Sequence, residues 1–318
     1  MVSAWELILQ HSANIAHNPE SRSYTDKSWA RPYPPMQNFT VHTTMDQEGL
    51  VHAAFDPAFL PLGADEEKRS AQPAYPPNER FWRLETEADV EHWWHTEISD
   101  IVLAAWARYP AIAQTCHTKP LCEVNIAENV DCTYAVYIGN QRAPVAIGEM
   151  KRNLINSREW QTSHLSEPQQ RLARELRGYA DKYQCPQVFC WDGRILLILQ
   201  FRARNSENIR AADCPIDCWV VPAAGSACTL RYALYRLMVQ GLRRCQSALA
   251  NRPLTVGSLT EHRREFFTGR PIWRVDGQSY ANHPEGYVRL VHAATGRLYW
   301  GHELIEDTVW ETDAFWEE

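Results

Sequence analysis

The pattern of apolar and polar positions predicts a folded domain that begins near residue 83 and combines helices with strands. Residues 86–109 carry apolar side chains at helical spacing, with polar residues between them. This apolar stripe consists of Val90, Trp94, Ile98, Ile101 and Ala105. Thr86 precedes a first turn rich in acids, which is typical of a helix N-terminus. The pattern therefore predicts one long helix.

A β-hairpin is predicted after this helix. Residues 130–139 are rich in β-branched and aromatic side chains, and residues 144–152 follow after a short polar turn. A helix over residues 166–183 comes next. Ser166 and Gln169 have the spacing of a capping box at its start.

The remaining elements complete a mixed architecture. Residues 187–201 read as two strands joined at an Asp-Gly turn, and residues 216–221 as a further strand. Residues 229–250 form a second long amphipathic helix, and residues 287–300 a late hairpin. The order of helix, hairpin, helix, strands and helix predicts an α/β fold with a mixed β-sheet flanked by helices.

The two ends of the chain look different from this body. Residues 1–80 combine a predicted helix at 4–16 with proline and charge clusters that lack periodicity. They are predicted to form an irregular, partly extended N-terminal arm. The tail, residues 309–318, alternates acids with aromatic residues. The acidic arm and the aromatic tail are both candidate surfaces for a protein partner.

Charge is unevenly distributed along the chain. The formal net charge is −7, which argues against a nonspecific polyanion binder. Residues 1–100 hold 7 basic and 16 acidic side chains, whereas residues 151–210 hold 11 basic and 6 acidic ones. The basic segment follows the predicted hairpin directly, although a solvated helix face would also explain it.

Neither secretion nor membrane insertion is predicted. The first residues lack a basic leader, and no apolar run approaches the ~18 residues of a membrane helix. The protein is therefore expected inside the cell, in the cytoplasm or the nucleus. The nine cysteines then predict buried thiols rather than a disulfide framework. The C-x4-C and C-x3-C spacings between Cys185 and Cys218 leave zinc as an alternative.

Candidate chemistry lies at the end of the hairpin. Strand side chains alternate, so Glu149 and Lys151 project to the same face. The hairpin can place Asp131 beside them. Two carboxylates and a lysine suit Mg²⁺-assisted hydrolysis of a phosphodiester. The alternative is a solvated strand end with a surface ion pair worth under ~1 kcal/mol.

The surroundings of these residues add a resemblance. The stretches "GEMKRNLINSREW", "QQRLARELRGYADKYQCPQVFCWDG" and "LLILQFRA" resemble the fungal branch of the PD-(D/E)xK nuclease-like superfamily. The resemblance covers about residues 85–250, with a weaker echo towards the C-terminus. It implies a restriction-endonuclease-like core within a nuclease-like domain spanning residues 81–318.

The resemblance also implies roles for individual residues. Asp131 and Glu149 match the acids that hold Mg²⁺ or Mn²⁺, and Lys151 matches the catalytic lysine. An acid on the preceding helix often completes the metal site, and here Glu91 or Glu97 is the candidate. Periodicity does not choose between these two.

The helix over residues 166–183 departs from the pattern of related nucleases. They often carry a Q-x-x-x-Y element, whereas Glu175 stands four residues before Tyr179 here. Polar side chains near the site are candidates for binding a nucleic-acid substrate: Arg152, Gln170, Arg174 and Arg177. His92 and His95 lie on the tryptophan-rich helix and are expected to be packing or surface residues, with metal binding as the alternative.

Three functions are compatible with these residues. The first is a Mg²⁺- or Mn²⁺-dependent nuclease. The second is a catalytically inactive nuclease-like protein that binds or scaffolds a partner. The third is a nuclease-like fold that acts on a small molecule in a fungal biosynthetic pathway, which predicts an enclosed apolar pocket lined by tryptophans.

Overall fold

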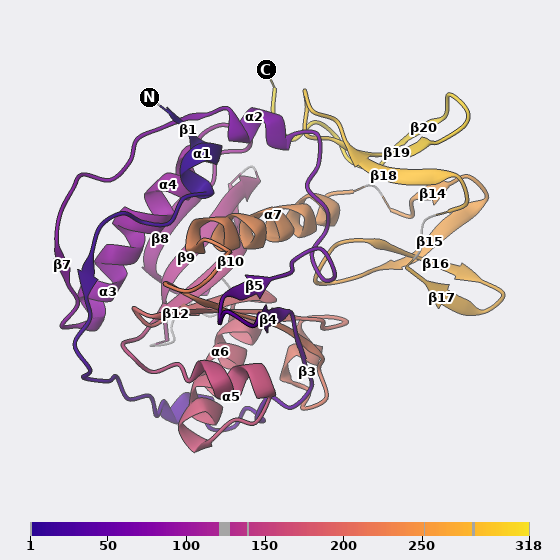
Figure 1. The fold of residues 1–318 in the computed structure, drawn as a ribbon. Coiled ribbons are helices and arrows are strands. Elements are labelled where there is room, and N and C mark those ends of the chain that lie inside the picture. Colours follow the sequence, from indigo (N-terminus) through magenta and orange to yellow (C-terminus); the bar gives the residue numbers. More distant parts are fainter. Residues whose placement is uncertain (1, 121–127, 139, 251, 282–283, 318) are drawn as a thin grey trace.

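A seven-stranded mixed β-sheet runs through the middle of the protein, with strand order β3-β13-β12-β11-β10-β9-β8 (Figure 1). The computed structural model describes residues 2–120, 128–138, 140–250, 252–281 and 284–317. The seven strands are β3 (Phe39–Val41), β8 (Ala113–Thr118), β9 (Val130–Ile138), β10 (Gln141–Met150), β11 (Gln187–Trp191), β12 (Ile195–Phe201) and β13 (Ile216–Pro222). The predicted α/β class with a mixed sheet is confirmed.

The predicted hairpin is formed by β9 and β10. The two strands pair antiparallel, with Gly148 opposite Cys132 and a register shift between Pro144 and Ala146. Strand β11 pairs with β10 in parallel, and β12 returns antiparallel beside β11. The predicted strand pair over residues 187–201 is therefore confirmed. Strands β3 and β8 had no clear signal in the apolar pattern.

Helices cover both faces of the sheet (Figure 1). Strand residues alternate between two separate apolar clusters, because successive side chains point to opposite faces. Phe189 and Trp191 pack on one face, and Val188 and Cys190 on the other. The helices on the first face are α1 (Ala4–Ile8), α3 (Glu87–Trp94), α4 (Asp100–Ala105) and α7 (Leu230–Ala248). Those on the second face are α5 (Ser157–Thr162) and α6 (Glu167–Lys182).

Local details of the predicted helices differ from expectation. Thr86 and Asp89 form a capping box at the start of α3, but a π-helical turn, His95–Ser99, separates α3 from α4. The predicted capping box of α6 is wrong. Gln169 Oε1 instead accepts hydrogen bonds from Trp160 Nε1 and the Asn156 backbone N–H, so the side chain is not free to cap.

The first 80 residues pack along the body. The predicted helix at 4–16 ends at Ile8, and its residues Ala4 and Leu7 join the core beneath α4 and α7. Strand β3 adds an edge to the main sheet by parallel pairing with β13. The other short elements are β1 (Val2–Ser3), β2 (Ala16–His17), β4 (Thr43–Met45), β5 (Val51–Ala53), α2 (Glu66–Ser70), β6 (Pro73–Ala74) and β7 (Trp82–Arg83).

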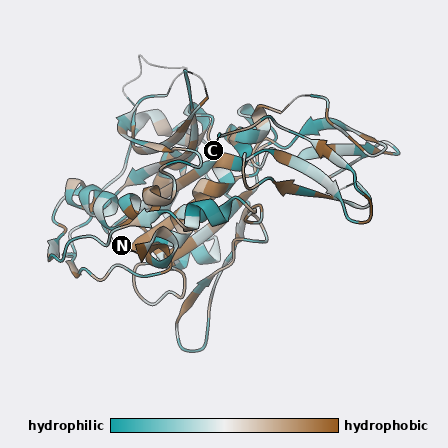
Figure 2. Ribbon diagram, turned by 90° about the horizontal axis from the view of Figure 1, so that it is seen from above, coloured by the Kyte–Doolittle hydropathy of each residue, from teal (hydrophilic) through white to brown (hydrophobic). Residues whose placement is uncertain are grey.

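Two small sheets follow α7 and project from one side of the body in both views (Figure 2). The first contains β14 (Thr255–Val256), β15 (Leu259–Arg264), β16 (Pro271–Val275) and β17 (Gln278–Tyr280), and the second contains β18 (Tyr287–Val291), β19 (Leu298–His302) and β20 (Thr308–Trp310). Their shared apolar cluster includes Trp273 and Trp300. The predicted hairpin over 287–300 is confirmed. In the tail, Trp316 is buried and Trp310 is partly exposed.

Within the described part of the chain, every helix is too short or too polar to cross a bilayer.

Candidate functional site

The hairpin brings Asp131 to the end of β10. Asp131 lies at the start of β9, and its Oδ2 accepts a hydrogen bond of 2.6 Å from the backbone N–H of Met150. Its side chain is 22% exposed, so it is the solvent-facing member of the group. Beyond β10, the backbone N–H of Lys151 donates to the Trp191 carbonyl over 2.9 Å. That bond extends the alternation of the strand to Lys151.

Glu149 and Lys151 face α6, as the strand period predicts. Lys151 Nζ lies 2.5 Å from Glu149 Oε1 and 3.3 Å from Glu175 Oε1. Both Glu149 and Lys151 are only 4% exposed, and Glu175 is fully buried. The hydroxyl of Thr25 donates to Glu175 Oε2. The ammonium is therefore shared between one carboxylate from the strand and one from the helix.

One oxygen in this group has no partner. Glu149 Oε2 is buried and accepts no hydrogen bond from any described residue. An unsatisfied buried carboxylate oxygen is costly, because it has lost its hydration without compensation. This oxygen therefore marks a position where a cation, a proton or an ordered water would be stabilised.

The electrostatics of the group favour a further positive charge. Burial raises the pKa of Glu149 well above its usual range, and the nearby carboxylates of Asp131 and Glu175 act in the same direction, whereas Lys151 opposes them. Burial also raises the pKa of Asp131. Burial disfavours the charged form of Lys151, but Glu149 and Glu175 outweigh it and raise the pKa of the ammonium. Lys151 consequently stays protonated.

Tyr179 belongs to the same surroundings. Burial raises the pKa of its phenol, and the carboxylates of Glu149, Glu175 and Asp131 raise it further. Glu175 and Tyr179 are one turn apart on α6, so the E-x-x-x-Y sequence aligns both side chains with the strand end. The departure from Q-x-x-x-Y thus places an additional negative charge beside Lys151.

The two candidate helix acids have different surroundings. Glu97 is fully buried and accepts hydrogen bonds from Ser12 Oγ, Asn14 Nδ2 and Trp82 Nε1 at 2.7–2.9 Å. Glu91 instead lies towards Asp131. His117 links the two acids, with Nε2 3.4 Å from Glu91 Oε2 and Nδ1 3.6 Å from Asp131 Oδ1. Of the two candidate acids, Glu91 is therefore the one on the Asp131 side.

The predicted substrate-binding residues do not form one surface. Arg152 is buried and bonds the carbonyls of Glu85 and Pro19, so it holds the N-terminal segment. Arg177 is buried and donates to the Ala211 carbonyl over 2.9 Å. Gln170 Nε2 donates to the Leu165 carbonyl, and Arg174 Nη1 lies 3.5 Å from Glu167 Oε1. Substrate binding by Arg152, Gln170, Arg174 and Arg177 stays a prediction.

The N-terminal segment that contains Pro19 and Ser23 covers the end of β10. The Ser23 backbone N–H donates to the Arg152 carbonyl over 2.8 Å, and Ser23 Oγ accepts from the Arg152 N–H over 3.0 Å. Asn153 Nδ2 donates to the Pro19 carbonyl over 2.6 Å. A polar groove of about 740 Å³ runs beside this contact, and Thr25 is part of its wall. Thr25 therefore separates the groove from Glu175.

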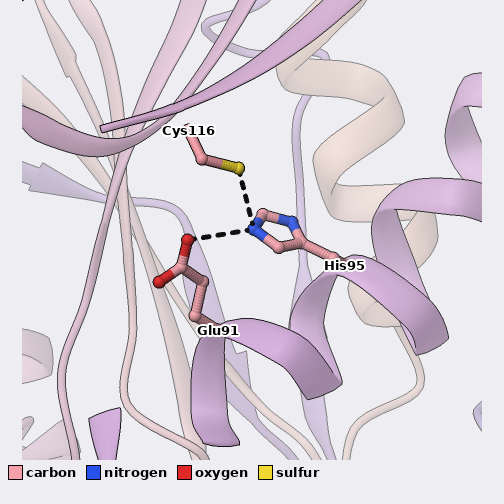
Figure 3. A group of neighbouring side chains, drawn as sticks. All are labelled: Glu91, His95 and Cys116. Atoms are coloured by element: carbon pink, nitrogen blue, oxygen red, sulfur yellow. Dashed lines mark hydrogen bonds and ion pairs between the residues drawn. The ribbon is translucent and has the colours of Figure 1, made fainter. Parts of the chain in front are cut away.

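Glu91 also belongs to a second cluster of possible metal ligands, with His95 and Cys116 (Figure 3). One ligand atom each from Glu91, His95 and Cys116 lies within 4.8 Å of the others. The sequence pattern favours a packing or surface role for His95, with metal binding as the alternative, and indicates no role for Cys116 or His117. The adjacent Cys-His pair just before the hairpin was the signal available in the sequence. The cysteines of the C-x4-C and C-x3-C pairs, in contrast, are buried free thiols.

No protein-family profile, curated protein or solved structure matches this chain.

Proposed function

We propose that this chain is a Mg²⁺- or Mn²⁺-dependent nuclease with a restriction-endonuclease-like core, hydrolysing phosphodiesters at the end of the β9–β10 hairpin. The observation that carries the proposal is the buried, unpartnered Oε2 of Glu149, beside Asp131 and Lys151. Hard carboxylate oxygens are the ligands that Mg²⁺ and Mn²⁺ prefer. The donor set therefore fits such an ion.

The charge balance supports the same conclusion. Asp131, Glu149 and Glu175 supply three carboxylates around the single ammonium of Lys151. Excess buried negative charge is unfavourable unless a cation or proton compensates it. Asp131 and Glu149 would hold a divalent ion, and Glu91 would reach it from the helix.

Each residue has a distinct role in the proposed reaction. A bound divalent ion lowers the pKa of a water and offsets charge on the phosphate. Lys151, held protonated by two carboxylates, supplies positive charge to the developing phosphorane rather than accepting a proton. Asp131 is the exposed end of the group, so substrate approaches from its side.

The test is cleavage of end-labelled DNA and RNA, single- and double-stranded, with Mn²⁺ or Mg²⁺. The wild-type protein should cleave at least one of these substrates. Asp131→Asn, Glu149→Gln and Lys151→Met should each lower the rate by about 10²–10⁴ while circular dichroism stays unchanged. Glu87→Gln, an exposed acid on the same helix as Glu91, is the matched control and should retain full activity. Cleavage that survives Glu149→Gln contradicts the proposal.

A specific observation also favours an inactive nuclease-like binding protein. Lys151 already has two carboxylate partners, and the segment around Ser23 and Thr25 covers the strand end. This second function predicts that Mn²⁺ neither binds between Asp131 and Glu149 nor changes the melting temperature. Wild-type protein without nuclease activity and without metal binding would support it.

A further inference from the structure

The cluster of Glu91, His95 and Cys116 combines three different types of metal ligand. Glu91 and His95 lie one helical turn apart, and Cys116 comes from the neighbouring strand β8 (Figure 3). His95 Nε2 is 3.3 Å from Glu91 Oε1 and 3.4 Å from Cys116 Sγ. These separations are close to those between ligand atoms of one tetrahedral ion, for which Zn–N is about 2.0 Å and Zn–S about 2.3 Å.

The ligand types indicate the class of ion. Thiolate and imidazole prefer borderline or soft ions such as Zn²⁺, whereas Mg²⁺ prefers an all-oxygen site. Cys116 is the exposed thiol among the described free cysteines, and the other seven are buried. An ion can therefore reach this sulfur from solvent. Three protein ligands with one open position is a common arrangement for Zn²⁺.

A fourth ligand is available from the next residue. His117 Nε2 lies 3.4 Å from the second oxygen of Glu91, so its ring is already adjacent to the cluster. His117 has a positive φ of 50°, which is uncommon for a residue other than glycine. This backbone conformation allows Cys116 and His117 to reach the same carboxylate from consecutive positions.

The helix is also irregular at this point. The π-helical turn begins at His95, one turn after Glu91. Such turns insert an extra residue and are frequent at functional sites, because they change the direction of a side chain without ending the helix. Two independent irregularities, the π turn and the φ of His117, thus coincide at one cluster.

The Nδ1 atom of His95 has a hydrogen-bond partner, as is usual for the nitrogen of a ligating histidine that does not bind the metal. Gln114 Nε2 lies 2.5 Å from His95 Nδ1. The oxygen and nitrogen of a carboxamide are exchangeable by a half-turn of the side chain. With the oxygen facing Nδ1–H, Gln114 would fix the tautomer that leaves the Nε2 lone pair free, as ligating histidines require.

We propose that Glu91, His95 and Cys116 bind a Zn²⁺-class ion, with His117 or a water as the fourth ligand. This site shares Glu91 with the proposed nuclease centre but contains neither Asp131 nor Glu149. The alternative to a metal site is an ordinary surface His–carboxylate pair with a neighbouring thiol. The pair of His52 and Asp46, with 3.0 Å between Nε2 and Oδ2, is a matched example of such a surface pair.

The test uses Co²⁺ as the probe, with full-length, metal-stripped and reduced protein. Binding at Cys116 should produce a thiolate-to-cobalt charge-transfer band in the near ultraviolet, saturating at one ion per chain, and Zn²⁺ should abolish the band by displacement. His95→Gln should weaken Co²⁺ binding by at least about tenfold, and Cys116→Ser should remove the band. His52→Gln should change neither.

The outcomes separate this site from the proposed nuclease centre. Glu149→Gln should keep the charge-transfer band, because Glu149 contributes no ligand to the cluster. A band that persists in Cys116→Ser, or wild-type protein that gives no band with Co²⁺, would overturn the inference. The melting temperature of each metal-free variant should equal that of the metal-free wild type, so that loss of the band cannot be due to unfolding.

Discussion

At the scale of single residues, two buried glutamates show opposite solutions to the burial of charge. Glu97 has three hydrogen-bond donors, so its carboxylate is satisfied by the protein alone. Glu149 has Lys151 on one oxygen and no partner on the other. A carboxylate with all its hydrogen bonds stabilises the fold. A carboxylate with one unpartnered oxygen is stabilised only when a cation, a proton or a water molecule binds there. The nuclease proposal depends on this difference.

The same substitution at the two positions should therefore have different effects. Without metal, Glu149→Gln should change the free energy of unfolding by no more than about 1 kcal/mol, because the burial cost of the charge and its repulsion by Asp131 and Glu175 are relieved while the ion pair with Lys151 is weakened. Glu97→Gln should lower it by about 2 kcal/mol, because an amide N–H would face existing donors. Urea unfolding with EDTA measures both. Equal losses at the two positions would contradict the account of Glu149.

At the scale of elements, close packing between helix and sheet positions the site. Helix α7 crosses β10 at Gly241, where an added Cβ would lie 1.9 Å from the Val145 carbonyl oxygen. Helix α6 has a comparable glycine, Gly178, but there the nearest atom, at 2.4 Å, belongs to the Trp29 ring. A backbone obstacle cannot rotate away, whereas a side chain can.

We expect Gly241→Ala to destabilise the protein by about 1–3 kcal/mol through overpacking. Gly178→Ala should be much milder, because the gain of about 1 kcal/mol in helix propensity offsets the displacement of Trp29. Thermal unfolding of the two variants measures the difference. A Gly241→Ala protein as stable as wild type would show that α7 can shift on β10.

At the scale of the whole molecule, the small C-terminal sheets are attached to the end of α7 by buried polar contacts. Gln246 Nε2 donates to the Gly296 carbonyl over 2.8 Å. Glu311 is buried between Arg264 and Arg289 of the two sheets, at 2.5 and 2.7 Å, and both arginines also donate to Ser247 of α7, at 3.3 and 2.5 Å. The site and these sheets are stabilised by separate interactions, so they should respond differently to acid.

Acid should weaken the C-terminal attachment. Burial opposes the charged form of Glu311, but Arg289 and Arg264 outweigh it and lower its pKa from 4.5 to about 2. The folded state then binds fewer protons than the unfolded state between these values, so its contribution is complete above pH 4.5 and lost as the pH falls to 2. The contribution is about 3 kcal/mol.

Glu311→Gln tests this pH dependence. The stability difference between wild type and the variant should be large at neutral pH and should shrink steadily as the pH falls through that range. Calorimetry at a series of pH values measures it. A difference that is independent of pH would mean that Glu311 contributes through packing rather than through charge.

The sequence predicted the parts of this molecule that follow from local periodicity. The hairpin and the shared face of Glu149 and Lys151 needed only a period of two residues. What it could not predict depends on contacts between distant segments. Nothing local distinguishes Glu91 from Glu97, because only the fold brings the N-terminal residues onto Glu97. The cluster of His95 and Cys116 likewise needs β8 beside the helix, a strand without a clear apolar pattern.

The most direct measurement of the central claim is anomalous diffraction from crystals soaked in Mn²⁺. Bound Mn²⁺ should give an anomalous peak bonded to oxygens of Asp131 and Glu149, at the position that the unpartnered Oε2 faces. The peak should be absent in Glu149→Gln crystals soaked in the same way. Manganese bound only at Glu91, His95 and Cys116, or not bound near Glu149 at all, would contradict the proposed nuclease centre.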